Sequence, residues 1–575
     1  MSMADWVGLA INVFGLAIQA YEVFQQAIEF PESYSAVVLK LDVELTRLQL
    51  WGKHSGVSQG SLAPDLLPFE SLIDRILRKL TNLLQDSARL KERYGLKPVE
   101  EVASNPGSHS KPLIQLRSVL RSIAGRHKVN APTTQTGTLE RVRWAISSQE
   151  QFKELVEEIR SYTNSLNELL LASQRATLQH DWERAGIRIV GAVDDPSGLS
   201  LVRQMARENS NCQNLSTMAS RKAIVENYAN QIGTVAGRSP NQLLLRQDFE
   251  LPSNYLSLSR CIALYSPKSP SPVPSTKTYV LVEKKPFDSH IRSEDKIALL
   301  SRLHRLMTLL NTTSDNEQGM LTPSLGYWSE DDCWCLVYRC PFVPSSTIPP
   351  QVVGSLTSAQ PLSLLHLLQS SSFRPALEQR LALANNLAAV LSRLYGGQWF
   401  HKGVRSDNIV FPQSPSPAFD ISRPVIVGFE YSRQYTEPAS IDFVAQDFCQ
   451  AVYRHPDYQG EAANRTGYRL SYDIYSFGLL LAEIAWWVPL EKVYQDVMRK
   501  KPGGGNLSEY RTPQAKSFME EISRKVGKEM AFRVGTVYQK VIDWCLKQGM
   551  TFADDKDLAV DFYSNVVVPL ETISK

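Results

Sequence analysis

Hydrophobic and polar residues alternate with helical periodicity through most of the first 175 residues. Residues 6–30 place apolar side chains on all sides of a helix, and Pro31 ends this segment. Apolar residues recur at helical spacing in three further stretches, 35–53, 66–95 and 139–177, and in a short one near 113–123. This pattern predicts an all-helical bundle over residues 4–175.

The pattern changes after residue 175. Residues 176–242 are polar and weakly periodic, which indicates a connector with short helical pieces. Strand-like segments then follow at 256–265, 278–283 and 333–339, and helical patterns dominate after residue 361. This order predicts an α+β bilobal domain over 243–570, with a small lobe over about 243–342 and a large lobe over about 343–570. The expected fold class is therefore multidomain, an all-α helical bundle followed by an α+β bilobal fold.

Composition places the chain among soluble globular proteins, with 43% hydrophobic and 21% charged residues. The net charge of +3 gives no reason to expect a nucleic-acid partner. Seven cysteines, an odd number spread through apolar runs, are typical of reduced thiols in a cytoplasmic protein. The first residues also lack the pattern of a secretory signal. Cys333 and Cys335 have no second pair at zinc spacing, so we expect core packing there and no metal site.

The strongest motif is the run from His401 to Asn408, HKGVRSDN, followed by the strand-like residues 409–411. It resembles the catalytic loop of protein kinases. Three later segments resemble further kinase motifs in the expected order. VIVGFEYSR at 425–433 corresponds to the D-F-G stretch, RHPD at 454–457 to A-P-E, and DIYSFG at 473–478 to the start of the central helix of the large lobe.

The resemblance fails at the residues that carry the chemistry. Phosphoryl transfer uses one aspartate for the hydroxyl proton, and a second aspartate with an asparagine to hold magnesium. Gly403 and Gly428 stand at the two aspartate positions, with Phe429 kept and Glu430 in place of the last motif glycine. Only Asn408 remains of the magnesium ligands. The resemblance therefore implies a pseudokinase without catalytic residues.

Other positions of the kinase pattern are kept or altered in a way that favours structure over chemistry. Arg405 replaces the lysine that contacts the transferred phosphate. His401, Asp473 and Gly478 are retained, and the family uses such residues to brace the catalytic loop and its central helix. We therefore expect a preserved frame around a degenerate site.

The nucleotide-binding elements are also incomplete. No glycine occurs between positions 237 and 319, so a glycine-rich phosphate loop is not expected. The strand at 280–285 resembles the kinase strand that carries the phosphate-pairing lysine, with Lys285 or Lys284 as that lysine and Glu294 as its helix partner. Together with Asn408 these are the candidate nucleotide-binding residues. No cofactor is assigned, and ATP bound without magnesium stays open.

Three N-terminal segments resemble the HeLo domain, the fungal prion-inhibition and propagation domain of heterokaryon-incompatibility proteins. They are GLAINVFGL at 8–16, LDVELTRLQLWG at 41–52 and RWAISSQEQF at 143–152. The resemblance implies a helical bundle whose first apolar segment damages membranes after activation. A helix that stays buried in the bundle is the alternative, because the apolar run of fourteen residues is shorter than the ~20 that span a bilayer. The membrane-active candidates are Ile11, Val13, Phe14, Leu16 and Ile18.

These features favour a fungal cell-death effector in which a catalytically impaired kinase-like module controls a HeLo-like bundle. Two alternatives remain. The first is an active protein kinase with displaced carboxylates such as Asp407, and the second is a scaffold that never contacts membrane. The expected partners are a regulatory protein or a second copy bound through the bundle, and a membrane on activation. The expected location is the cytoplasm, with recruitment to the plasma membrane.

Overall fold

The computed structural model divides the chain into two compact units, residues 1–219 and 220–575. The description covers residues 3–99, 110–124, 143–206, 212–226, 243–267, 277–287, 292–312, 320–340, 361–411, 421–429, 448–459, 468–499, 501, 510–548 and 554–575, with side chains from residue 11 onward. The domain limits predicted from the sequence, 4–175, 176–242 and 243–570, differ from these two units and remain predictions.

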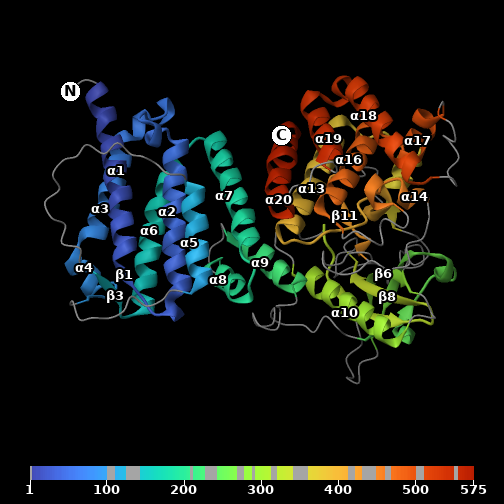
Figure 1. Ribbon diagram of the computed structural model, residues 1–575, viewed down its shortest axis with the longest axis horizontal. Coiled ribbons are helices and arrows are strands. Elements are labelled where there is room, and N and C mark those ends of the chain that lie inside the picture. Colours follow the sequence, from blue (N-terminus) through green and yellow to red (C-terminus); the bar gives the residue numbers. More distant parts are fainter. Residues whose placement is uncertain are drawn as a thin grey trace. The chain divides into compact units, whose positions relative to one another are not determined.

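The N-terminal unit is helical, as the sequence predicted (Figure 1). Five of its helices lie side by side as a bundle: α1 (Met3–Ala27), α2 (Ser35–His54), α3 (Glu70–Gln85), α5 (Lys111–Ala124) and α6 (Gln149–Leu169). The shorter elements are 3-10 turns at Glu32–Tyr34, Val57–Gln59 and Pro64–Phe69 and the helix α4 (Ser87–Glu92).

A small three-stranded sheet closes one end of the bundle and differs from the sequence-based expectation. Its strands are β1 (Ile28–Glu29), β3 (Trp144–Ile146) and β2 (Leu96–Pro98), in the order β1-β3-β2. The sequence predicted helix from 139 to 177, but α6 begins only at Gln149, where the side chain of Ser148 caps it. Trp144 and Ile146 are buried on either side of a half-exposed alanine, the alternation of a strand.

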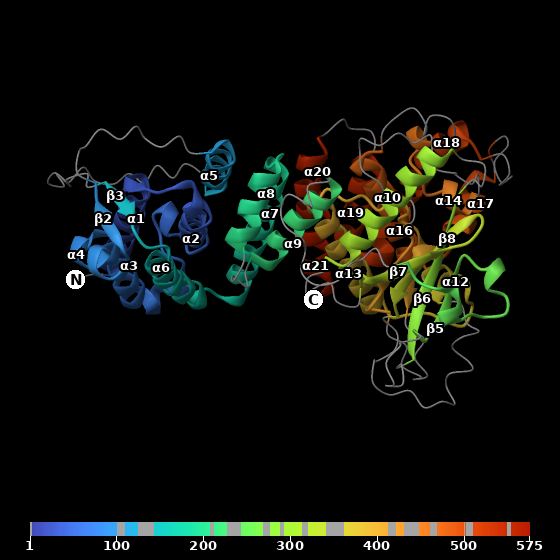
Figure 2. The same cartoon turned by 90° about the horizontal axis from the view of Figure 1, so that it is seen from below.

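Three helices occupy much of the stretch that the sequence assigned to a connector: α7 (Ala172–Ala192), α8 (Pro196–Ala206) and α9 (Gln213–Val225). Residue 175 therefore lies inside α7. Both α7 and α8 pack on α2 and α5 (Figure 2). The buried residues of α7 lie only in its second half, from Trp182 to Gly191, where most sides of the helix are covered. No amphipathic stripe therefore runs along its whole length, which explains the weak periodicity of the segment.

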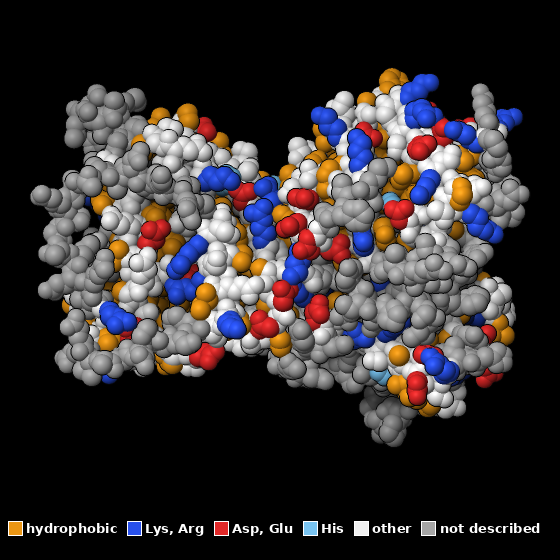
Figure 3. Space-filling model, in the orientation of Figure 1, with side chains coloured by type: hydrophobic (Ala, Val, Ile, Leu, Met, Phe, Trp, Pro, Cys, Tyr) orange, Lys and Arg blue, Asp and Glu red, His pale blue; other side chains and the backbone are white. Residues whose placement is uncertain are grey.

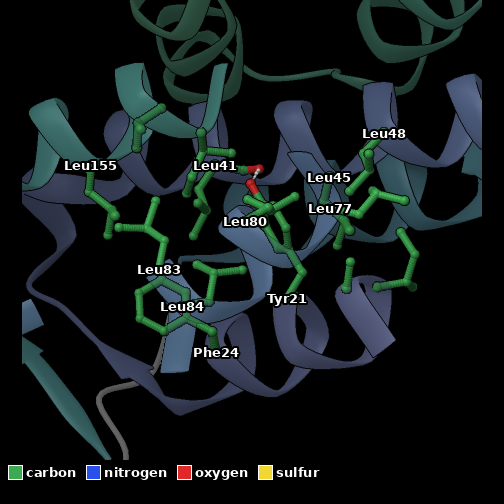
Figure 4. Packing of buried hydrophobic residues seen from close by; sticks show 14 of the residues in the cluster. Tyr21, Phe24, Leu41, Leu45, Leu48, Leu77, Leu80, Leu83, Leu84 and Leu155 are labelled. Atoms are coloured by element: carbon green, nitrogen blue, oxygen red, sulfur yellow. Dashed lines mark hydrogen bonds between the residues drawn. The ribbon is translucent and has the colours of Figure 1, made fainter. Parts of the chain in front are cut away.

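The core of the N-terminal unit surrounds α2, which is buried along nearly its whole length. Leucines of α2, α3 and α6 interlock with Tyr21 and Phe24 of α1 (Figure 4). The hydroxyl of Tyr21 is also buried, and it donates to the carbonyl oxygen of Leu41 on α2 at 2.9 Å. A buried hydroxyl without such a partner would cost roughly 1–3 kcal/mol, so this bond fixes where α1 lies on α2.

The second unit is α+β, as predicted, and begins with an antiparallel sheet of five strands in the order β4-β5-β6-β8-β7. The helix α10 (Ser293–Leu310) packs against β7. The bounds predicted for β8 agree with the structure, and those predicted for β6 end three residues too early. Of the strand predicted at 256–265, only the second part is a strand, because the first part belongs to a 3-10 turn at Tyr255–Ser257. The strands are β4 (Phe249–Glu250), β5 (Arg260–Tyr265), β6 (Thr278–Pro286), β7 (Ser324–Ser329) and β8 (Cys333–Arg339).

Helices make up most of the rest of this unit, and every residue of the central helix, α16 (Leu470–Trp486), is buried. A second, small sheet has the order β11-β10-β9, from β9 (Leu362–Ser363), β10 (Ile409–Phe411) and β11 (Val425–Ile426). The other helices are α12 (Leu364–Gln369), α13 (Leu377–Gly396), α14 (Phe448–Ala451), α17 (Leu490–Met498), α18 (Thr512–Val534), α19 (Thr536–Gln548), α20 (Asp555–Phe562) and α21 (Val568–Ser574), with 3-10 turns at Arg246–Asp248, Ser406–Asn408 and Pro456–Tyr458 and a π-helical turn at Tyr563–Val567.

No single helix in the described part of the chain is long and apolar enough to cross a membrane. The helices α16 and α17 meet that criterion only as a pair bent by 90°. Basic and acidic side chains of the described residues are interspersed on the face shown in Figure 3.

Candidate functional site

The loop from His401 to Asn408 connects α13 to β10 and is fastened to α16 by a buried carboxylate. Asp473 on α16 accepts the backbone N–H groups of His401 at 2.6 Å and Lys402 at 2.8 Å, and the hydroxyl of Tyr468. Burial raises the pKa of Asp473 to about 6, although these three hydrogen bonds act in the opposite direction. Among the described residues, Lys402 is one of three non-glycine residues with a positive φ. The hydrogen bonds from the N–H groups of His401 and Lys402 to Asp473 hold the backbone in this unfavourable conformation.

His401 is a structural residue of this loop. Its Nδ1 atom accepts the backbone N–H of Gly403 at 3.1 Å, so Nε2 carries the proton and donates to the carbonyl oxygen of Val427 at 3.0 Å. Burial, helped by the nearby Arg405 guanidinium, lowers the pKa of His401 to about 3. The ring is fully buried and packs against Phe429. A neutral imidazole with both nitrogens engaged is a brace and not a proton shuttle.

Asn408 lies at the centre of the site, and both polar atoms of its side chain make hydrogen bonds. Its Nδ2 atom donates to the carbonyl oxygen of Gly403 at 2.8 Å. Its Oδ1 atom accepts from Nη2 of Arg260 at 3.0 Å. The residue is fully buried, and its own carbonyl oxygen accepts the N–H of Val427. Asn408 therefore joins the loop to the sheet and to the 425–429 segment.

The two glycines at the aspartate positions leave room for Asn408. Gly428 has φ of +82°, a left-handed conformation that favours glycine. A Cβ atom on Gly428 would lie 2.2 Å from Cγ and Nδ2 of Asn408, closer than packing allows. A Cβ atom on Gly403 would lie 3.1 Å from the same Nδ2. The asparagine thus fills the space next to Gly428 and lies close against Gly403.

A buried ion pair completes the site, and the sequence analysis missed it. Arg260 and Glu283 are cross-strand neighbours on β5 and β6, with side chains 12% and 3% exposed. Nε of Arg260 donates to Oε1 of Glu283, and Nη1 donates to the carbonyl oxygen of Asp407 at 3.2 Å. Glu283 also accepts the backbone N–H of Gly428 at 3.2 Å. Glu283 ends the buried apolar run of β6, and Arg260 begins the apolar strand β5. A carboxylate in a buried strand position needs a cation or hydrogen-bond donors nearby, and this is the signal that could have indicated the pair.

The structure does not bring the predicted nucleotide-binding residues together. Lys284 donates to the carbonyl oxygen of Leu256 at 2.8 Å and lies over the ring of Tyr255. Lys285 is buried on the sheet, and Glu294 is exposed in the first turn of α10. Of the four predicted residues, Asn408 lies at the centre of the site.

The remaining predicted positions lie around this centre. Arg405 is nearly buried, with Nη2 4.0 Å from a carboxylate oxygen of Asp407, and the Asp407 side chain is 43% exposed. Gly478 allows α16 to approach α19, because a Cβ atom there would lie 2.8 Å from that of Cys545. Glu430 lies outside the described residues.

The residues present do not fit a magnesium–nucleotide complex. The Asn408 oxygen that would bind the metal accepts a hydrogen bond from an arginine, and the neighbouring aspartate positions hold glycines. In the described part of the chain, no group of three His, Cys, Asp or Glu residues is placed to hold a metal ion. Cys333 and Cys335 lie in the core of the five-stranded sheet.

The membrane-active candidates lie on α1. Val13, Phe14 and Ile18 are buried in the bundle and Ile11 is partly buried, whereas Leu16 is 45% exposed. The ring of Phe14 packs against Trp51 and fits over Gly52, where a Cβ atom would lie 2.2 Å from Cζ of the ring. The apolar side of α1 is thus satisfied by α2 and α3 in this state.

The family comparison concerns the N-terminal unit. Residues 6–202 match the HeLo family model, described as prion-inhibition and propagation. This match confirms the HeLo resemblance of the N-terminal segments and extends it through α7 into α8. No curated protein matches the chain. The kinase-like character of the second unit stays a prediction from its motifs and the geometry of the 401–408 loop.

Proposed function

We propose that this protein is a non-catalytic effector of the fungal incompatibility and cell-death type, in which a kinase-like second unit controls a HeLo-like bundle. The match of residues 6–202 to the HeLo family carries the proposal. The second unit receives the activating signal, and the bundle acts on a membrane once α1 leaves its place. Both steps are changes between conformational states, which a signal produces by binding one state more tightly.

The geometry of the 401–408 loop supports a controlling and not a catalytic role. Asn408 fills the space next to Gly428 and lies close against Gly403. The alternative of an active kinase needs a displaced base, and Asp407 is the nearest carboxylate in the loop. Its side chain is largely solvated, and its backbone carbonyl oxygen is tied to Arg260. These contacts argue against phosphoryl transfer by this site.

Polar contacts hold α1 in the bundle and support a restrained state. Gln25 on α1 donates to the carboxylate of Asp42, a buried residue of α2. Arg117 on α5 pairs with the same carboxylate, with 2.8 Å between Nε and Oδ2. When α1 leaves, Asp42 keeps Arg117 but loses the hydrogen bond from Gln25. A hydrogen bond to a charged group contributes roughly 1.5–3 kcal/mol, so the first helix leaves only with a compensating change.

The proposal is tested by dye leakage from vesicles of phosphatidylcholine and phosphatidylserine. The full chain is compared with residues 1–226, whose fold is checked by circular dichroism. We expect the fragment to release dye at micromolar concentration and the full chain to release at least tenfold less. Leu16→Asp should abolish leakage without unfolding the bundle, because Leu16 is half-exposed and a charge opposes insertion.

Leu67→Asp is the matched control, because Leu67 is 38% exposed in the same unit but lies outside α1. This variant should leak like the parent fragment. Equal leakage by the fragment and its Leu16→Asp variant would remove α1 from the mechanism. A folded fragment that releases no dye would favour the scaffold alternative. Transfer of labelled phosphate from ATP by the full chain would favour the kinase alternative.

A further inference from the structure

Arg260 makes hydrogen bonds in three directions from one guanidinium group. Nε contacts Glu283 on β6, Nη1 contacts the carbonyl oxygen of Asp407, and Nη2 contacts Oδ1 of Asn408. Glu283 in turn accepts the N–H of Gly428 in the 425–429 segment. Two strands and two loop segments therefore meet at one ion pair, which is called the Arg260–Glu283 clasp below.

We propose that the Arg260–Glu283 clasp takes the place of a metal–nucleotide complex in this unit. Arginine is a permanent cation with a rigid set of five N–H donors, so it neutralises the site and orients the oxygens that a metal would otherwise use. The clasp fastens the sheet to the 401–408 and 425–429 segments without any ligand. The nucleotide part of this inference rests on the kinase-like assignment of the proposed function, whereas the fastening follows from the contacts alone.

The charges of the clasp also oppose nucleotide binding. Nη2 of Arg260 donates to the Asn408 oxygen, so a magnesium ion would have to displace it and approach a guanidinium. The carboxylate of Glu283, 3% exposed, is already paired with Nε of Arg260 and also accepts the N–H of Gly428. An anion and a cation that already pair with each other in a largely buried site leave neither charge for a ligand.

The fastening is tested in the full chain by hydrogen exchange, followed in peptides that cover the four segments 257–265, 278–287, 401–411 and 421–429. Arg260→Met should raise exchange in all four segments, by about tenfold or more in rate, because it leaves Glu283 buried without its cation. Arg260→Lys should raise exchange less, since lysine keeps the charge but not the three-way donor geometry. Glu283→Gln should also loosen all four segments.

An exposed ion pair of the same sheet region provides the control. Lys277 and Glu250 pair at 2.8 Å, and each side chain is 59% exposed. Lys277→Met should leave exchange in the two loop segments at the level of the parent chain. If the Arg260 variants raise hydrogen exchange only in segment 257–265, the clasp does not fasten the loops and the inference is wrong. If Arg260→Met fails to fold, the hydrogen-exchange comparison is made with Arg260→Lys.

Nucleotide exclusion is tested by thermal unfolding with ATP and ADP at millimolar concentration, with and without magnesium. The full chain should show midpoint shifts below about 1 °C, whereas a bound nucleotide at 100 times its Kd would raise the midpoint by several degrees. Stabilisation of the parent chain by either nucleotide would overturn the exclusion. Neither measurement involves membranes, so failure of the clasp and failure of the proposed effector function are separable.

Discussion

Two glycines determine what the 401–408 loop can do, because the side chain of Asn408 fills the space next to Gly428 and lies close against Gly403. Gly428 adds a conformational requirement, with φ of +82°. Packing around Asn408 therefore opposes a side chain at position 428. A side chain there would need Asn408 and its partner Arg260 to move together.

Restoring the aspartate at position 428 should not create a kinase. Gly428→Asp places a Cβ atom 2.2 Å from Asn408. It also puts a residue with a side chain in a left-handed backbone conformation, which favours glycine. We expect a loss of about 2–3 kcal/mol in the free energy of unfolding of this unit, and no transfer of labelled phosphate from ATP.

Gly527→Ala is the control for glycine replacement as such. Gly527 lies inside α18, and a Cβ atom there would meet no other atom within 4 Å. This variant should be neutral or more stable by up to about 1 kcal/mol, measured by urea unfolding. Robust phosphate transfer by Gly428→Asp, or unchanged stability, would contradict the packing argument.

At the scale of elements, α2 organises the N-terminal unit through charged residues that other helices neutralise. Asp42 pairs with Arg117 on α5 and with Gln25 on α1. Glu44, fully buried, pairs with Arg160 on α6 at 3.1 Å. The end of α2 is tied to α7 in the same way, by Asp181. The helices α1, α5, α6 and α7 thus each have a polar contact that specifies their position on α2, in addition to apolar packing.

The contact between α2 and α7 predicts a pH-dependent stability. Asp181 contacts Nζ of Lys53 at 2.8 Å and Nε2 of His54 at 3.0 Å. Burial raises the pKa of Asp181, but the hydrogen bonds from His54 and Lys53 outweigh it and hold the pKa well below its usual range. A lowered pKa in the folded state means that this stability is present above pH 4 and is lost as the pH falls below it.

We expect Asp181→Asn to be less stable than the parent chain by about 1–2 kcal/mol at pH 7. The difference should narrow as the pH is lowered from 4 towards 2.5, because the carboxylate of the unfolded parent chain then takes up a proton while that of the folded chain stays ionised. Urea unfolding followed by circular dichroism measures both chains across this range. Asp74→Asn, which affects an exposed helix pair with Arg78, should change stability by less than about 0.5 kcal/mol. A difference that does not vary with pH would show that the charge is not responsible.

At the scale of the whole molecule, the chain folds as two units whose division lies within α9, between Ala219 and Ser220. Gly186 of α7 faces Leu215 and Met218 of α9, and both of these side chains are buried. The N-terminal unit therefore continues well beyond the bundle that the sequence delimits at residue 175.

This extension predicts how N-terminal fragments behave. Residues 1–226 should fold with a cooperative thermal transition. Residues 1–175 should unfold at least 10 °C lower or remain partly unfolded, because they lose the α7 and α8 side chains that cover α2 and α5. Far-UV circular dichroism against temperature measures both fragments. Equal midpoints would show that α7 and α8 do not contribute to the bundle.

The sequence alone determined the features that depend on local pattern. Helical periodicity located the bundle, a short apolar run located β8 at its observed bounds, and the order of short motifs pointed to the 401–408 loop. The HeLo resemblance belongs to the same level, since it resides in contiguous segments, and the family match confirms it.

Only the tertiary structure decided what fills the degenerate site. Glu283 is adjacent in sequence to the two lysines that the motif suggested, yet strand alternation turns Lys284 to the opposite face of the sheet from Glu283. The partner of Glu283 is 23 residues away on β5, and Asn408 joins them from another segment 148 residues from Arg260. Strand β3 and most of α7 escaped prediction for a related reason, because their buried faces are defined by neighbours distant in sequence. Local sequence pattern therefore located the loop, whereas contacts between residues distant in sequence determined which side chains surround it.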